Sequence, residues 1–178
     1  MRNLTGIKPQ DVIIMMKLVS QPEMVQKELA QQLQISQAEI SHALMRLKNS
    51  HLLNSSGRVI KEACIEFLVH AVKYIFPVNM SSPAIGIPTS FAHPKFKYIK
   101  YDNDEVLVWP YAEGKVKGIS LLPIYPTLPE ACLKDKNLYK LSSFVEMIRA
   151  GRARERNIAE KELIKFIGEL NEKKRYPS

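Results

Sequence analysis

Ser36 and Glu39 are the residues whose spacing says most about what this chain could recognise. They form the pattern S-x-x-E directly before a run of helical periodicity. In this pattern the serine oxygen accepts a hydrogen bond from the third backbone N–H, and the glutamate reaches back to the serine N–H. The pattern predicts a helix over residues 37–49, after a three-residue turn from a shorter helix over residues 24–33.

The predicted helix over residues 37–49 has two chemically different faces. Its inner face is apolar and consists of Ile40, Leu44 and Leu47. Its outer face is polar and basic and contains no acidic residue, because Glu39 is expected to be held by the cap. A capped helix of this kind, presented after a tight turn, is how many proteins enter the major groove of DNA. The outer face consists of Gln37, Ser41, His42, Met45, Arg46, Lys48 and Asn49.

The run ISQAEISHALMRLKNSHLLN, with a short hairpin expected straight after it, resembles the recognition helix and wing of winged helix-turn-helix regulators of the MarR type. The resemblance covers roughly residues 8–76. Gln34 and His51 depart from it, since each stands where the family usually has glycine. The resemblance implies that Gln37, Ser41 and His42 face bases, that Arg46 faces a phosphate, and that Arg58 reaches a neighbouring groove. The predicted DNA-binding set is Ser36, Gln37, Ser41, His42, Met45, Arg46, Lys48 and Arg58.

The charge distribution favours an acidic partner. The chain of 178 residues has 26 Lys and Arg against 18 Asp and Glu, a net charge of +8. Residues 1–76 carry +3, residues 77–132 are neutral and residues 133–178 carry +5. Such a balance indicates phosphate or another acidic partner, but not a particular fold. We divide the chain at these boundaries into a winged helix-turn-helix domain, a proline-rich and aromatic-rich middle segment, and a C-terminal helical region.

The middle segment, residues 77–132, holds 8 of the 11 prolines, and we expect no helix at that density. Short strands are predicted over 96–101 and 105–109, with a third after Gly114. The segment is too apolar for a free linker, so we expect it to pack onto the C-terminal helices, either within the chain or across a dimer, with Trp109 as an anchor. Two alternatives are a pocket for a small effector, walled by Trp109, Tyr111 and Tyr125, and a protein-binding surface.

The helix predicted over residues 61–76 is apolar nearly all round, which requires burial on most sides. Either the C-terminal helices or a second copy of the chain must cover it. Because modules that bind duplex DNA often pair about a dyad, we favour a homodimer. The predicted interface consists of Ile65, Phe67, Leu68, Val72 and Ile75.

Two C-terminal helices are predicted, with Gly151 as the break between them. Four arginines lie around this break, at Arg149, Arg152, Arg154 and Arg156. They form either a solvated helix face or a contact with phosphate or an acidic partner, because the guanidinium group binds both anions in a bidentate way.

Several classes of protein are disfavoured by the sequence. The longest apolar stretch carries charges, so no membrane span is expected, and the N-terminus lacks a secretory pattern. Cys64 and Cys132 are expected to be free thiols in a reducing cytoplasm. The histidines lack metal-ligand spacing, and no nucleotide-binding or hydrolase motif occurs. We therefore expect no enzyme, cofactor or metal.

The overall expectation is a mainly α fold with a small β component. Its expected function is that of a cytoplasmic, sequence-specific regulator that binds double-stranded DNA. The alternative is an antitoxin-like or adaptor protein that binds a protein partner through residues 77–170.

Overall fold

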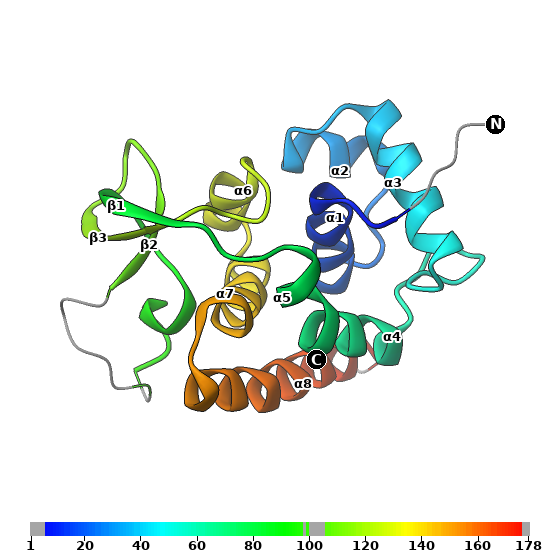
Figure 1. Ribbon diagram of the computed structural model, residues 1–178. Helices are drawn as coiled ribbons and strands as arrows, with labels where there is room; N and C mark the ends of the chain where they lie inside the picture. Colours follow the sequence, from blue (N-terminus) through cyan, green and yellow to red (C-terminus); the bar gives the residue numbers. More distant parts are fainter. Residues whose placement is uncertain (1–5, 98, 100–105, 176–178) are drawn as a thin grey trace.

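The computed structural model describes residues 6–97, 99 and 106–175, and it is mainly helical with one small sheet, as the sequence predicts (Figure 1). The helices and strands follow one another as α1 (Pro9–Ser20), α2 (Gln26–Leu33), α3 (Gln37–Asn49), α4 (Lys61–Glu66), the π-helix η1 (Phe67–Ala71), α5 (Val72–Ile75), β1 (Met80–Pro88), the 3₁₀-helix η2 (Ser90–Ala92), β2 (Leu107–Pro110), β3 (Val116–Leu121), α6 (Leu128–Lys134), α7 (Lys136–Ala150) and α8 (Ala153–Arg175).

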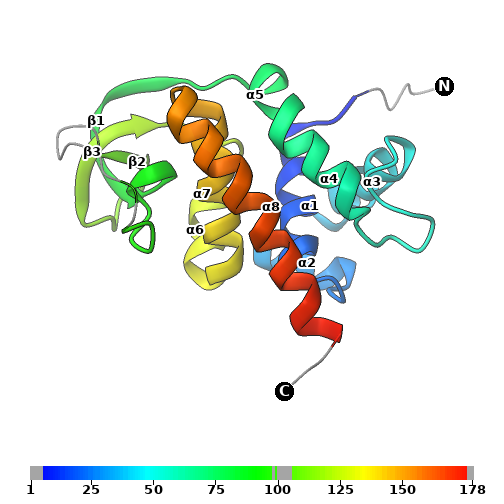
Figure 2. The same ribbon diagram turned by 90° about the horizontal axis from the view of Figure 1, so that it is seen from below.

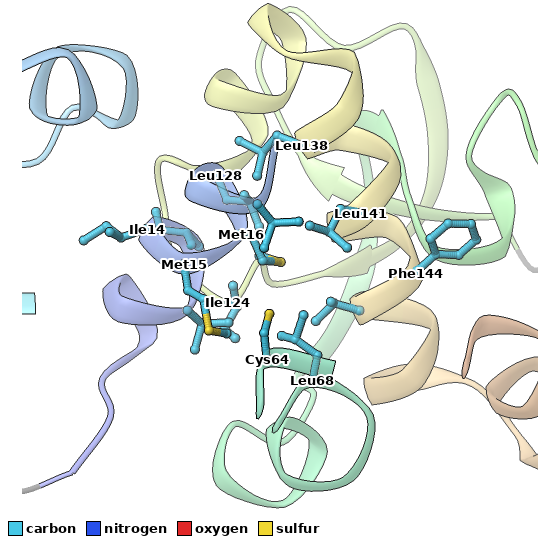
Figure 3. Close-up of a cluster of buried hydrophobic side chains, with 14 of the residues drawn as sticks. Ile14, Met15, Met16, Cys64, Leu68, Ile124, Leu128, Leu138, Leu141 and Phe144 are labelled. Carbon is cyan, nitrogen blue, oxygen red and sulfur yellow. The ribbon is translucent and has the colours of Figure 1, made fainter. Parts of the chain in front are cut away.

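Helix α1 lies at the centre of the molecule, and every residue from 11 to 20 is buried. Its sequence has no continuous polar face, which is typical of a helix that is covered on all sides. Helices α2 and α3 pack on one part of α1, while α7 and α8 pack on another. Figure 3 shows Met15 and Met16 of α1 in a cluster with Leu68 of η1 and Leu141 of α7.

A buried ion pair joins α1 to α7. The Lys17 Nζ atom lies 2.6 Å from the Asp135 Oδ2 atom, and both side chains are almost fully buried. The Ser20 hydroxyl donates to the same carboxylate, which also caps α7 by accepting from the backbone N–H groups of Asn137 and Leu138. Burial opposes the charged form of Asp135, but the bonds from Lys17, Leu138 and Ser20 outweigh it and hold its pKa below the usual value.

The helix predicted over residues 61–76 is present as α4, η1 and α5, but its apolar side is covered within the same chain. Leu68 and Val72 are fully buried, and these elements pack against α7 and α8. The prediction that Leu68 and Val72 lie in a dimer interface is therefore wrong. The other option, coverage by the C-terminal helices, is confirmed for these two residues.

The three strands form a closed sheet. β1 pairs antiparallel with both β2 and β3, and β2 pairs parallel with β3. In the registers, Ile87 lies opposite Trp109 and Ser81 opposite Ser120. A Cβ on Gly86 would lie 1.9 Å from the Trp109 carbonyl oxygen, so the strands can approach this closely only because residue 86 is glycine.

The middle segment packs on α7, as predicted. Trp109 is fully buried, and its indole Nε1 donates to Glu146 Oε1 at 3.3 Å. The Phe96 ring stacks on Phe144 of α7 with 4.5 Å between centroids, and the Tyr139 hydroxyl of α7 donates to the carbonyl oxygen of Pro88. The role of Trp109 as an anchor within the chain is confirmed.

The strand predictions for the middle segment are correct only in part. β2 and β3 confirm the strands expected near Trp109 and after Gly114, whereas β1 was not predicted. In the strand predicted over 96–101, residues 96, 97 and 99 are not in a strand, and the other residues lie outside the described part of the chain. The expectation of no helix within residues 77–132 is also wrong, because α6 begins at Leu128 with Pro129 in its first turn, where proline is tolerated.

The C-terminal helices close the fold. Gly151 separates α7 from α8, as predicted. Helix α8 runs along the molecule and contacts α7, α1 and α4 (Figure 2). The hydrophobic core is one continuous cluster with members from all three predicted segments. Within the part of the chain that is described, no helix is long and apolar enough to cross a bilayer.

Stability should depend on pH through Asp135. Asp135→Asn keeps an oxygen for the α7 cap but leaves Lys17 buried without its counter-charge, so we expect a loss of about 3–5 kcal/mol at pH 7. Because the folded-state pKa of Asp135 is lowered, this contribution is complete above the ordinary aspartate value of about 4 and disappears as the pH falls through the folded value. Urea unfolding from pH 7 to pH 3 should show the gap between wild type and variant closing. Glu113→Gln, at an exposed position, is the control, and a gap that stays constant would contradict the prediction.

Candidate nucleic-acid interface

Helix α3 begins where the sequence predicts, at Gln37. The Ser36 side chain accepts a hydrogen bond from the backbone N–H of Glu39 at 3.2 Å, as a serine N-cap does. The reciprocal half of the predicted capping box is absent, because the Glu39 carboxylate accepts from Arg46 at 2.5 Å and from Gln10 at 3.0 Å. The main cause of the lowered pKa of Glu39 is the hydrogen bond from Arg46, which burial opposes.

Two residues with left-handed backbone lie at the ends of the predicted recognition motif. Gln34, between α2 and α3, has a φ of 54°, and His51, after α3, has a φ of 55°. These are the two positions at which the MarR-type pattern has glycine, the residue that adopts positive φ without steric cost. Gln34 and His51 therefore both adopt a backbone conformation that favours glycine, although neither residue is glycine.

The outer face of α3 is open to solvent. Met45 is 44% exposed, while Ile40, Ala43 and Leu47 on the inner face are fully buried. His42 Nδ1 lies 3.9 Å from Glu39 Oε2, within reach of a weak ion pair when the imidazole is protonated. The exposed members of the predicted set on this helix and its cap are Ser36, Gln37, Ser41, His42, Met45 and Lys48.

Arg46 is not part of this exposed face, so its prediction as a phosphate contact is wrong. The side chain is only 2% exposed and makes two hydrogen bonds to Asp11 of α1, from Nε to Oδ2 at 2.8 Å and from Nη2 to Oδ1 at 2.6 Å. This bidentate bond raises the pKa of Arg46 although burial opposes it. Arg46 therefore joins α3 to α1, and its guanidinium group cannot reach a ligand.

The hairpin after α3 is short. A single antiparallel bridge pairs Leu53 with Val59, and the Asn54 side chain accepts from the backbone N–H of Arg58 at 3.0 Å. The Arg58 side chain is 67% exposed and pairs with Glu23 at 3.4 Å. An exposed pair of this kind is worth at most about 1 kcal/mol, so Arg58 can exchange Glu23 for another anion.

A groove of about 750 Å³ lies between the start of α2, one side of α3 and the hairpin. Lys48 and Arg58 line it together with Asn54, Ser56 and Gly57 of the hairpin. Glu23 is an acidic member of its wall. The groove places the two exposed cations of the motif beside the outer face of α3.

The four C-terminal arginines do not act as one cluster. The Arg149 Nε atom donates to the carbonyl oxygen of Phe76 at 2.8 Å, and its Nη1 lies 2.5 Å from Glu146. Its side chain is 4% exposed, so the prediction that Arg149 contacts an acidic partner is wrong. Burial raises the pKa of Glu146, although Arg149 and Trp109 oppose this rise. Arg152, Arg154 and Arg156 are exposed.

Other predicted sites receive little support from the geometry. Trp109 is fully buried and cannot wall an open effector pocket, and Tyr111 and Tyr125 pack against the core. Cys64 and Cys132 are buried free thiols, and burial raises the pKa of Cys64 to about 12, which makes it a poor nucleophile. No group of three or more His, Cys, Asp or Glu residues converges in the described ranges.

The roles of Asp11 and Lys17 were missed by the sequence analysis. A signal was present, because Asp11 directly precedes the apolar run from Val12 to Val19 and Lys17 interrupts it, and a buried charge needs a partner. No family model matches the chain, and neither the curated proteins nor the solved structures contain a match to it.

Replacing Arg46 should reduce stability rather than alter a surface contact. Arg46→Ala leaves Asp11 buried and unpaired, with an expected loss of about 3–5 kcal/mol in the free energy of unfolding. Lys48→Ala, two residues along the same helix but exposed, should change it by no more than about 0.5 kcal/mol. Urea unfolding at pH 7 measures both. Equal stabilities of Arg46→Ala and wild type would contradict the role assigned to this pair.

Proposed function

We propose that the chain is a sequence-specific regulator that binds double-stranded DNA, with α3 in the major groove as in MarR-type winged helix-turn-helix proteins. One observation carries the proposal. The outer face of α3 exposes amide, hydroxyl, imidazole and thioether groups, while Glu39, its nearest acid, is engaged by Arg46 and Gln10. A helix face without free carboxylates can approach the phosphates that border the groove.

The phosphate contacts come from Lys48 and Arg58 in place of Arg46. Both are exposed, and both line the groove between α3 and the hairpin. The short hairpin brings Arg58 to the flank of the helix, where the duplex backbone would pass. Phosphate contacts of this kind orient the protein, while groups on α3 supply the sequence preference.

Burial of the middle segment favours DNA over the alternative of a protein partner held by residues 77–170. Trp109 and Phe96, which would be the strongest anchors for a partner, are already packed on α7 within the chain. The exposed arginines Arg154 and Arg156 remain as surface cations.

We propose further that the regulator is a homodimer. The interface would consist of the apolar side chains that stay exposed or half-buried on α5 and on the helical turns before it. Ile75 is 49% and Tyr74 76% exposed, and Ile65 and Phe67 are half-buried.

We expect light scattering to give the mass of two chains at tens of micromolar. Ile75→Glu should give a folded monomer, because it would place a charge in the interface. Ile164→Glu, at an exposed isoleucine of α8, is the control, and a wild-type monomer would contradict the dimer.

The salt dependence of DNA binding tests the phosphate contacts. For each lost contact, the slope of log K against log [salt] should decrease in magnitude by about 0.9. Lys48→Ala and Arg58→Ala should each show this decrease and weaken binding to all duplexes by a similar factor. Fluorescence anisotropy with a labelled duplex that the wild-type protein binds, in a salt titration, measures the slope.

Lys117→Ala, at an exposed lysine of β3, is the matched control and should leave the slope unchanged. If the wild-type protein binds no duplex in a salt-dependent way, the proposed function is wrong.

A further inference from the structure

We infer that α3 recognises a half-site rich in A·T pairs. This inference rests on the proposed function and specifies its target. In the major groove, guanine is most often bound by Arg or Lys, cytosine by Asp or Glu, adenine by Asn or Gln, and the thymine methyl by apolar groups. The burial and pairing of the side chains of α3 decide which of these groups are available.

Apart from Lys48, the groups of α3 suited to G·C pairs are engaged in ion pairs: Arg46 is buried, and Glu39 is only partly exposed. Arg46 would bind guanine O6 and N7, but its guanidinium is buried on Asp11. Glu39 could accept from the cytosine amino group, but one carboxylate oxygen is already bonded to Arg46 and Gln10. Freeing Arg46 would break its ion pair with Asp11 of α1. Freeing Glu39 would break its ion pair with Arg46 and its hydrogen bond from Gln10 of α1.

The groups that remain on the surface match A·T pairs. Gln37, Ser41 and Met45 are each four residues apart, so they lie along one line of the exposed face. The Gln37 amide can donate to and accept from adenine N7 and N6, and the Met45 side chain, 44% exposed, can contact a thymine methyl. Ala38, also exposed, adds a second small apolar group at the start of the helix.

The one exposed cation on α3 lies at its other end. A Cβ added to Gly57 would lie 3.9 Å from Lys48 Cε, so this side chain runs beside the hairpin loop. It lines the groove there together with Arg58. We therefore assign Lys48 to the backbone phosphates and not to a guanine.

The first experiment is selection of bound duplexes from a random pool by the full chain. We expect A·T pairs at the central positions of each half-site. Selected half-sites with fixed G·C pairs at those positions would overturn this inference and leave DNA binding intact. Recovery of no duplex above background would instead contradict the proposed function itself.

The second experiment changes single atoms of the bases in the selected duplex. Uracil in place of thymine removes the methyl group and should weaken wild-type binding about fourfold, as expected for one buried carbon. Met45→Ala should bind the thymine and uracil duplexes equally, whereas the control Met80→Ala, at an exposed methionine of β1, should retain the fourfold difference. If uracil weakens wild-type binding at no thymine position, the assigned contact between Met45 and a thymine methyl is wrong.

The same design tests the adenine contact. 7-Deazaadenine lacks N7 and so loses one of the two hydrogen bonds from Gln37. Wild-type binding at the contacted position should weaken by part of the about 5- to 150-fold that a whole bidentate pair is worth. Gln37→Ala should lose this sensitivity. Gln31→Ala, at an exposed glutamine of α2, should behave as wild type, and a Gln37→Ala protein that still discriminates by the same factor would overturn the assignment.

Discussion

The bidentate bond between Arg46 and Asp11 is the interaction on which the rest of the interface depends. Asp11 is a fully buried carboxylate in the first turn of α1, and such a group is unfavourable unless it is paired and hydrogen-bonded. Arg46 supplies the counter-charge and two hydrogen bonds, and its Nη2 also donates to Glu39. The orientation of α3 about its own axis is thereby fixed, because any rotation that exposed Arg46 would leave the buried Asp11 carboxylate without its counter-charge.

Helix α1 extends this constraint through the whole molecule. One end of its buried stretch is tied to α3 through Asp11, and the other is tied to the start of α7 through Lys17 and Asp135. The helix that presents the proposed DNA contacts and the helix that supports the sheet are thus both attached to one central element. Figures 1 and 3 show α1 between these two parts of the chain.

The sequence predicts best those features that depend on neighbouring residues. The bounds of α3 follow from the N-cap residue Ser36 and from the helical periodicity of the residues after it, and they are as predicted. The break between α7 and α8 follows from Gly151 alone and is also as predicted. The position of Arg46 could not be predicted in this way, because residue 46 lies at the border of the inner face, and Asp11, 35 positions earlier, decides that it turns inward.

Contacts between residues far apart in the sequence also explain the other differences between the predictions and the structure. β1 contains Pro83 and Pro88, which argue against a strand when residues are considered singly. Its pairing with two other strands accommodates both prolines, with a shift in register between Ser81 and Ala84. Leu68 and Val72 look like interface residues only as long as the positions of α7 and α8 are unknown.

The buried ion pairs determine where the net positive charge of the chain lies. Among the described residues, Lys17, Arg46 and Arg149 are buried cations, and each has a buried acid as partner: Asp135, Asp11 and Glu146, respectively. These pairs carry no net charge, so the whole +8 of the chain is carried by the remaining groups. A chain that withdrew its cations into the core without matching acids would lose the long-range attraction that draws it to a polyanion. Here the three pairs are each neutral, so the positive charge stays on groups outside them, as the proposed contact with DNA requires.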